Sequence, residues 1–262
     1  MIVRSQEDGT LILVTQSDHA RLSGIFAAHW GNAEFARPEP RESFIRAAAL
    51  HDCGWFSYET RPLYDPEKAA PPNFQQVPLD AKQLAAFQGG LDWIWGIDPY
   101  AGLLVSRHRT GLWRNRYNAV TYPAASASVR VLTPDVEDFI ARNELKQETE
   151  LATHDRARLL VNYQLLQMLD LLSLYFCTAE PVETRLAQVP PDYAGDGRDG
   201  VTLTLTPEGD GRVRISPNPF DRRELEVAFV YRQLPSSGFA SQEDFRAAYF
   251  GAAPKVKSFT LV

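Results

Sequence analysis

The stretch "AAALHDCGW", residues 47–55, decides how the chain is expected to fold, because it ends an apolar helical pattern with two side chains that can ionise or bind metal. An α-helix advances about 100° per residue, so His51 lies on the same line as Phe44 and Ala48. The histidine therefore points toward the interior with the apolar face, and Asp52 follows it directly. A buried helix end with this pair needs partners for both groups.

The same helical spacing places two further titratable residues on the inward faces of their helices. His19 shares its helix face with Leu22 and Phe26. Asp170 lies within the most apolar stretch of the chain, residues 159–176, and has apolar neighbours on most sides. A central aspartate costs roughly 3 kcal/mol on membrane-insertion scales, so we predict a buried helix here and no membrane span.

Two inward carboxylates with two inward imidazoles form a natural cage for a divalent metal, because a buried carboxylate without a cation is costly. Imidazole and carboxylate ligands suit manganese, iron, zinc or magnesium. A second interpretation needs no metal. In it Asp170 pairs with an arginine, Asp52 caps a helix end, and His19 and His51 are core residues with hydrogen-bond partners.

The order of these residues resembles the His…His-Asp…Asp pattern of the HD-domain superfamily, over residues 17–176. In detail, "HDCGW", "DPYAGLLVSRHRTGLW" and "YQLLQMLDLLSLYF" resemble an uncharacterised bacterial family. The superfamily is helical and consists largely of metal-dependent phosphohydrolases, with a branch of di-iron oxygenases. The resemblance thus implies an HD-domain-like helical bundle that binds metal.

Carried over residue by residue, the resemblance makes His19, His51, Asp52 and Asp170 the metal ligands. It adds His108 as a candidate further ligand, since two-metal members recruit histidines between the pair and the last aspartate. The chain offers no second histidine near His108, so a full two-metal site is not expected. In this scheme Asp52 both binds the metal and orients the attacking water.

A basic stretch surrounds His108 in a chain that is acidic overall. Guanidinium groups grip phosphate or carboxylate through two parallel hydrogen bonds, so these arginines are candidates for binding an anionic substrate. They are Arg107, Arg109, Arg114 and Arg116. Only one or two are expected to enter the pocket, and pairing with glutamates is the alternative for each. Trp55 is a candidate pocket residue, and the proline-rich loop 60–78 is expected to close over the site.

The pattern of elements predicts one domain over residues 1–262. Residues 1–16 read as a hairpin around the Asp8-Gly9 turn, and alternating Val- and Thr-rich segments follow residue 200. We expect these ends to pair in one small antiparallel sheet, with a helical HD-like core over about 17–180. The predicted fold class is therefore mainly α.

Composition restricts the partners and the compartment. The formal net charge is −6, which does not favour a nucleic-acid-binding protein, since those usually carry a basic face. The first residues lack the apolar run of a signal peptide, so we expect a cytoplasmic protein that does not bind membranes. The two cysteines, Cys53 and Cys177, are far apart in apolar surroundings, and we expect them to be free thiols.

These features together predict a metal-dependent hydrolase of a small anionic substrate, with a phosphate ester as the first candidate. Asp52, His108 and Arg109 are the expected catalytic residues, and Arg107, Arg109, Arg114 and Trp55 the expected substrate-binding ones. Two alternatives remain open. One is a non-catalytic binding protein that keeps the HD-like helices, and the other is a di-iron oxygenase, which would need more histidines.

Overall fold

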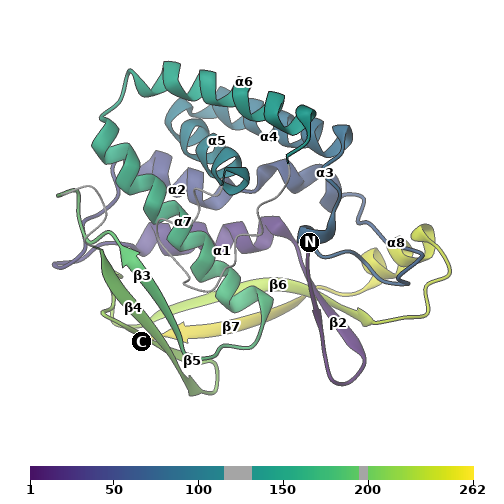
Figure 1. Ribbon diagram of the computed structural model, residues 1–262. Helices are drawn as coiled ribbons and strands as arrows, with labels where there is room; N and C mark the ends of the chain where they lie inside the picture. The colour runs from purple at the N-terminus through teal and green to yellow at the C-terminus, as the bar shows by residue number, and fades with distance from the viewer. Residues whose placement is uncertain (115–131, 195–199) are drawn as a thin grey trace.

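The computed structural model describes residues 1–114, 132–194 and 200–262. Over these residues the fold is mixed α/β, with a seven-stranded sheet beside the helices (Figure 1). The expectation of a mainly α HD-like bundle with a small sheet is therefore wrong. The sheet is larger because strands form where loops or short hairpins were expected.

The sheet has the strand order β1-β2-β6-β7-β5-β4-β3 in the described part of the chain. The strands are β1 (Ile2–Ser5), β2 (Thr10–Val14), β3 (Thr184–Val189), β4 (Val201–Gly209), β5 (Arg212–Ser216), β6 (Leu225–Pro235) and β7 (Lys255–Leu261). Antiparallel pairing of β2 with β6 joins the two ends of the chain, with Leu11 opposite Leu234. The last strand, β7, lies between β6 and β5 and runs parallel to β5.

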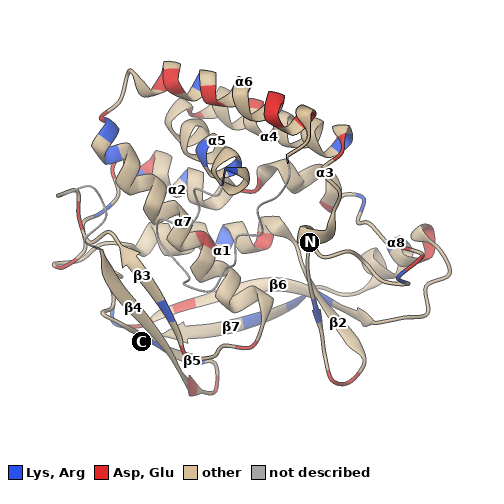
Figure 2. Ribbon diagram, in the orientation of Figure 1, with Lys and Arg blue, Asp and Glu red and all other residues tan. Residues whose placement is uncertain are grey.

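The helices connect and cover these strands. They are α1 (Gln16–His29), α2 (Arg41–Leu50), the short 3₁₀ helix η1 (Cys53–Trp55), α3 (Phe56–Glu59), the 3₁₀ helix η2 (Phe74–Gln76), α4 (Ala81–Ile97), α5 (Pro99–Trp113), α6 (Pro134–Leu151), α7 (Arg156–Thr178) and α8 (Gln242–Gly251). In Figure 1, α1 and α7 lie next to the sheet, and α4, α5 and α6 lie farther from it. Acidic and basic residues are interspersed along α6, whose outward face is exposed (Figure 2).

Alternating side chains of the strands divide between two cores. Ile12 and Val14 of β2 join the large core under the helices, whereas Leu11 and Leu13 join a smaller core with α8. Successive residues of a strand point to opposite faces, so a run of buried residues in β2 means that both faces are covered. The sheet is thus packed between the main helical layer and α8 at this end.

The helix α7 is the centre of the large core. It is long and apolar enough to cross a membrane, but 83% of its most apolar 18-residue window is buried inside the protein. Its neighbours include α1, α2 and α5 on one side and the strands β1 and β3 on the other. Asp170 enters the interior from this helix.

Two glycines let α4 approach the turn that follows His51 and Asp52. A Cβ atom on Gly90 of α4 would lie 2.7 Å from the backbone N and Cα atoms of Gly54. A Cβ atom on Gly54 would lie 2.4 Å from the ring of Phe87 on α4. Both distances are shorter than a carbon contact permits, so the position of the His51–Asp52 turn depends on these two glycines.

We expect Gly90→Ala to destabilise the protein by about 1–3 kcal/mol, because the new methyl group meets backbone atoms that cannot move aside. Gly89→Ala is the matched control, since a Cβ atom there meets nothing within 4 Å. In an exposed helix position that change should stabilise by about 0.5–1 kcal/mol. Urea unfolding of both variants measures the difference, and equal stabilities would contradict the close approach.

Candidate metal centre

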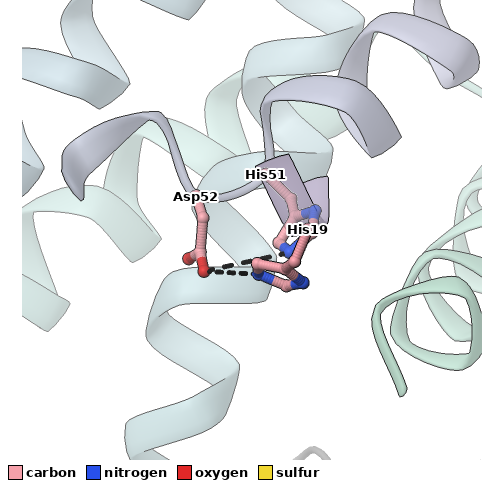
Figure 3. A group of neighbouring side chains, drawn as sticks. All are labelled: His19, His51 and Asp52. Atoms are coloured by element: carbon pink, nitrogen blue, oxygen red, sulfur yellow. Dashed lines mark hydrogen bonds and ion pairs between the residues drawn. The ribbon is translucent and has the colours of Figure 1, made fainter. Parts of the chain in front are cut away.

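Four separate elements bring five titratable side chains together, and we call these five residues the His–Asp cluster. They are His19 on α1, His51 at the end of α2, Asp52 before η1, His108 on α5 and Asp170 on α7. All five are buried, with at most 6% of each residue exposed. Figure 3 shows the rings of His19 and His51 turned toward the carboxylate of Asp52.

The candidate ligand residues form two overlapping groups. The first consists of His19, His51 and Asp52, and the second of His51, His108 and Asp170. Within each group the nearest ligand atoms lie within 4.8 Å of one another. His51 belongs to both groups, and its ring lies edge-on to those of His19 and His108, with centroids 4.9 Å apart in each case. The four ligands predicted from sequence, and His108 with them, thus surround one small volume.

The tautomer of His19 follows from its hydrogen bonds. Its Nδ1 atom lies 2.8 Å from the hydroxyl of Ser173, and that hydroxyl donates its own hydrogen to the carbonyl of Asp170. Because the hydroxyl has only one hydrogen, it accepts from His19, and Nδ1 of the histidine carries a hydrogen. In the neutral ring the lone pair is then on Nε2, which lies 3.1 Å from Oδ2 of Asp52.

His51 is arranged in the same way. Its Nδ1 atom lies 2.9 Å from the carbonyl oxygen of Ala48, which can only accept, so Nδ1 carries a hydrogen. Its Nε2 atom lies 3.2 Å from Oδ1 of Asp170. Each histidine thus directs Nε2 at a carboxylate oxygen, and a proton or a cation is needed between the two atoms.

Protonation satisfies the His51 contact in the metal-free protein. Burial alone would lower the pKa of His51, but the charge of Asp170 and its contact with the ring outweigh burial and raise the pKa to about 9. Burial would raise the pKa values of Asp52 and Asp170, yet the nearby positive groups hold both below the usual range. At neutral pH the two carboxylates are ionised and His51 is a cation.

His108 behaves in the opposite way. Burial, followed by the positive charge of His51, lowers the pKa of His108 to about 3. The ring is therefore neutral at physiological pH and keeps a lone pair. This residue can bind a metal without first losing a proton.

Arg109 is the arginine of the basic stretch that enters the cluster. Its Nη2 atom lies 2.5 Å from Oδ1 of Asp52. The guanidinium group lies over the ring of Phe87, 4.2 Å from the ring centroid, which fixes its direction. Arg109 is 7% exposed, so its ion pair with Asp52 is buried. The pairing of an aspartate with arginine, considered above for Asp170, occurs at Asp52.

The other predicted substrate-binding residues lie elsewhere. Arg114 pairs with Glu137 and Glu144 on α6. Pairing with glutamates was the alternative to substrate binding that the sequence left open for each arginine. Arg107 stacks over the ring of Tyr163 on α7, 5.4 Å from the centroid. Arg116 lies outside the described residues. Arg114 thus pairs with α6, and Arg109 contacts Asp52 of the cluster.

Trp55 and the loop 60–78 pack against neighbouring parts of the fold. Trp55 is 3% exposed and packs edge-on against Phe87, so it supports the ring beneath Arg109. Within the loop, Tyr64 stacks on Phe245 of α8. The backbone N–H of Phe74 donates to the carbonyl of Met1. The loop thus lies against α8 and the start of β1.

Sequence reasoning missed two polar residues that hold the cluster. Gln16 is buried and donates from Nε2 to Oδ2 of Asp52 at 2.9 Å, and Ser173 orients His19. Each stands three residues from a cluster member on its own helix, Gln16 before His19 and Ser173 after Asp170. That spacing places them on the same helix face and was the available signal.

Residues 1–236 of the chain match the protein family described as "Protein of unknown function (DUF3891)". The chain belongs to this family. The comparison with curated proteins and that with solved structures gave no match. The matched region contains the whole His–Asp cluster and ends just after β6. The chemistry of the cluster must therefore be argued from its own geometry.

We expect Arg109→Met to destabilise the metal-free protein by about 3–5 kcal/mol, because it leaves the buried carboxylate of Asp52 without its cation. Arg114→Met, at the C-cap of the same helix, is the matched control, since its ion pairs are partly exposed and should contribute less than about 1 kcal/mol. Urea unfolding in the presence of a chelator gives both values. Similar small losses for the two variants would mean that the Arg109–Asp52 pair is not needed.

Proposed function

We propose that the protein is a metal-dependent hydrolase that acts on a small anionic substrate, with a phosphate ester as the first candidate. The observation that carries the proposal is the orientation of His19 and His51. Each histidine commits Nδ1 to a protein acceptor and directs Nε2 at a carboxylate oxygen. This is how metal-binding histidines are commonly held, with the second nitrogen fixed by a hydrogen bond.

Each of the two groups of three donors is close to the size that a divalent cation requires. Three imidazoles and two carboxylates suit manganese, iron or zinc. Atoms bound to one ion at about 2.1 Å lie at most about 4.2 Å apart, so the two groups, whose atoms lie within 4.8 Å, need only a small contraction. His51 is shared by both groups, which favours one ion over the two that a di-iron oxygenase requires.

The charges of the cluster favour an anionic ligand once a metal is bound. The carboxylates of Asp52 and Asp170 and the guanidinium of Arg109 sum to −1, and a divalent cation changes the sum to +1 when the histidines are neutral. Metal binding would displace the proton from His51, whose Nε2 then becomes a ligand. A buried site with one excess positive charge attracts a phosphate or carboxylate group.

A bound divalent cation supplies Lewis acidity, which activates water and stabilises negative charge on a phosphoryl oxygen. The chain's own residues would position the reactants. Asp52 is held by Gln16 at one oxygen and by Arg109 at the other, so its carboxylate has a fixed orientation. Arg109 can also donate to an anionic substrate, since its guanidinium has five N–H groups. His108 is a poor base at neutral pH because of its low pKa, so we assign it to metal binding and not to proton transfer.

The exposed fractions of the side chains indicate from which side a substrate would approach the cluster. The side chains of Asp52, Asp170 and Arg109 are 7%, 7% and 9% exposed, whereas those of His19 and His51 are at most 1% exposed. Solvent therefore reaches the cluster from the side of the carboxylates and Arg109. The phosphate of a small substrate would enter from this side and meet the guanidinium first.

We expect Asp170→Asn to weaken metal binding by more than about 100-fold with little effect on folding, because the two side chains are nearly isosteric and loss of an outer-shell partner alone costs 10–100-fold. Asp138→Asn on the exposed face of α6 is the matched control and should bind metal like the parent. Protein purified without chelator is analysed for metal and titrated with Mn²⁺ and Zn²⁺. A parent protein that binds neither ion would contradict the proposal.

The same proteins then test hydrolysis. Phosphate monoesters, diesters and nucleotides are incubated with metal-loaded parent, Asp170→Asn and Asp138→Asn, and released phosphate or alcohol is measured. The proposal expects activity in the parent and the Asp138 variant and loss in the Asp170 variant. Metal binding without activity on any substrate class would instead support the non-catalytic binding protein.

A further inference from the structure

A pocket lies between α3 and the start of α4. Its volume is about 290 Å³. It is lined by Ser57, Tyr58, Thr60, Arg61, Leu63 and Lys82. We call it the α3–α4 pocket. Its volume is near the lower end of small-molecule sites, so it has room for a phosphate group with a small attached fragment.

The two cations of this pocket have no acidic partner. In the described part of the chain no Asp or Glu lies within ion-pair distance of Arg61 or Lys82. Arg114, by contrast, pairs with Glu137 and Glu144. Both cations are exposed and line the same cavity, so an anion bound there gains favourable charge interactions with each of them.

The pocket also offers hydroxyl groups. Among the described residues, the side-chain hydroxyls of Ser57 and Tyr58 have no hydrogen-bond partner, whereas that of Thr60 donates to the carbonyl of Ser57. Burial and then the charge of Asp80 raise the pKa of Tyr58, so its hydroxyl keeps its hydrogen and can donate. Arg61, Lys82, Ser57 and Tyr58 together provide donors in several directions. A tetrahedral oxyanion has acceptors to match them.

One acidic residue lies close to the pocket. The carboxylate of Asp80 accepts a hydrogen bond of 2.8 Å from the backbone N–H of Gln83 and thereby caps α4. This residue is not among those that line the cavity. The lining therefore carries two positive charges and no negative charge.

Aromatic rings separate the pocket from the cluster. The ring of Trp55 lies 5.7 Å from that of Tyr58 and 5.3 Å from that of Phe87, between centroids. Arg109 lies over Phe87. An anion in the pocket is thus screened from the metal centre by Trp55 and Phe87.

We propose that the α3–α4 pocket binds the phosphate group of a small ligand through Arg61 and Lys82, at a place separate from the His–Asp cluster. The site requires no metal and does not rest on the hydrolase activity. Arg61 grips two phosphate oxygens through its planar guanidinium, and Lys82 approaches a further oxygen as a point charge. The hydroxyls of Ser57 and Tyr58 complete the set of donors.

The test uses inorganic phosphate with chelator-treated full-length protein at low ionic strength, and calorimetry or ³¹P line broadening measures binding. We expect saturable binding by the parent and roughly tenfold weaker binding by Arg61→Gln and by Lys82→Gln, since each removes a charge-assisted contact. Arg223→Gln removes an exposed cation outside the pocket and should bind like the parent. Acetate in place of phosphate should bind more weakly, because it offers fewer acceptor oxygens.

A variant of the His–Asp cluster tests whether phosphate binding in the pocket is independent of the metal centre. Asp170→Asn alters the His–Asp cluster and should leave phosphate binding by the chelator-treated protein unchanged. Absence of saturable binding by the parent would overturn the proposal. So would equal binding by the Arg61 and Lys82 variants and the parent, or a change in affinity confined to Asp170→Asn. Matching thermal melts of the variants confirm that each one is folded.

Discussion

The buried carboxylates of Asp52 and Asp170 each face the Nε2 atom of a histidine whose other ring nitrogen is already engaged. Removing two carboxylates from water is costly, so the interior must supply positive charge at this point. In the metal-free protein the charge comes from protonated His51 and from Arg109. A divalent cation would take over much of this role and would use the same nitrogen and oxygen atoms.

Much of the surrounding structure serves to keep these groups at fixed distances. The five members come from the helices α1, α5 and α7 and from the turn after α2, and the helix α7 that carries Asp170 is enclosed by α1, α2, α5 and the sheet. Gly54 and Gly90 let α4 come close to the turn after Asp52, and Phe87 of that helix then supports Arg109. Because these supports are rigid helices and not loops, a small change in the packing of α4 would be transmitted directly to the cluster.

The inward direction of His19, His51 and Asp170 could be predicted from sequence because helical periodicity fixes the face of each residue. The helical core over about residues 17–180 followed from the same periodicity. The extent of the sheet could not be predicted in this way. β7 pairs with β6 and β5, and β3 forms an edge strand before residue 200, ahead of the strand-like segments identified from the sequence. Such pairings depend on partners distant in sequence.

The partners of the arginines could not be predicted from the sequence for a similar reason. Arg109 lies on α5 and Arg114 caps the end of that helix five residues later. Helical periodicity shows that the two side chains point in different directions, but it does not show which residues each one contacts. Phe87 and Asp52 lie on one side, and Glu137 and Glu144 of α6 lie on the other. The contributions of Gln16 and Ser173 were likewise hidden, although each has helical spacing to a cluster residue.

The most direct test of the account is diffraction from crystals grown with Mn²⁺, recorded at a wavelength where manganese scatters anomalously. The account predicts one anomalous peak within the His–Asp cluster, about 2.0–2.6 Å from Nε2 of His19 and His51 and from a carboxylate oxygen of Asp52 and Asp170. Crystals without a peak there, in which Nε2 of His51 still donates to Asp170 and Arg109 still pairs with Asp52, would contradict it. The proton and the guanidinium would then be the only cations that the cluster needs.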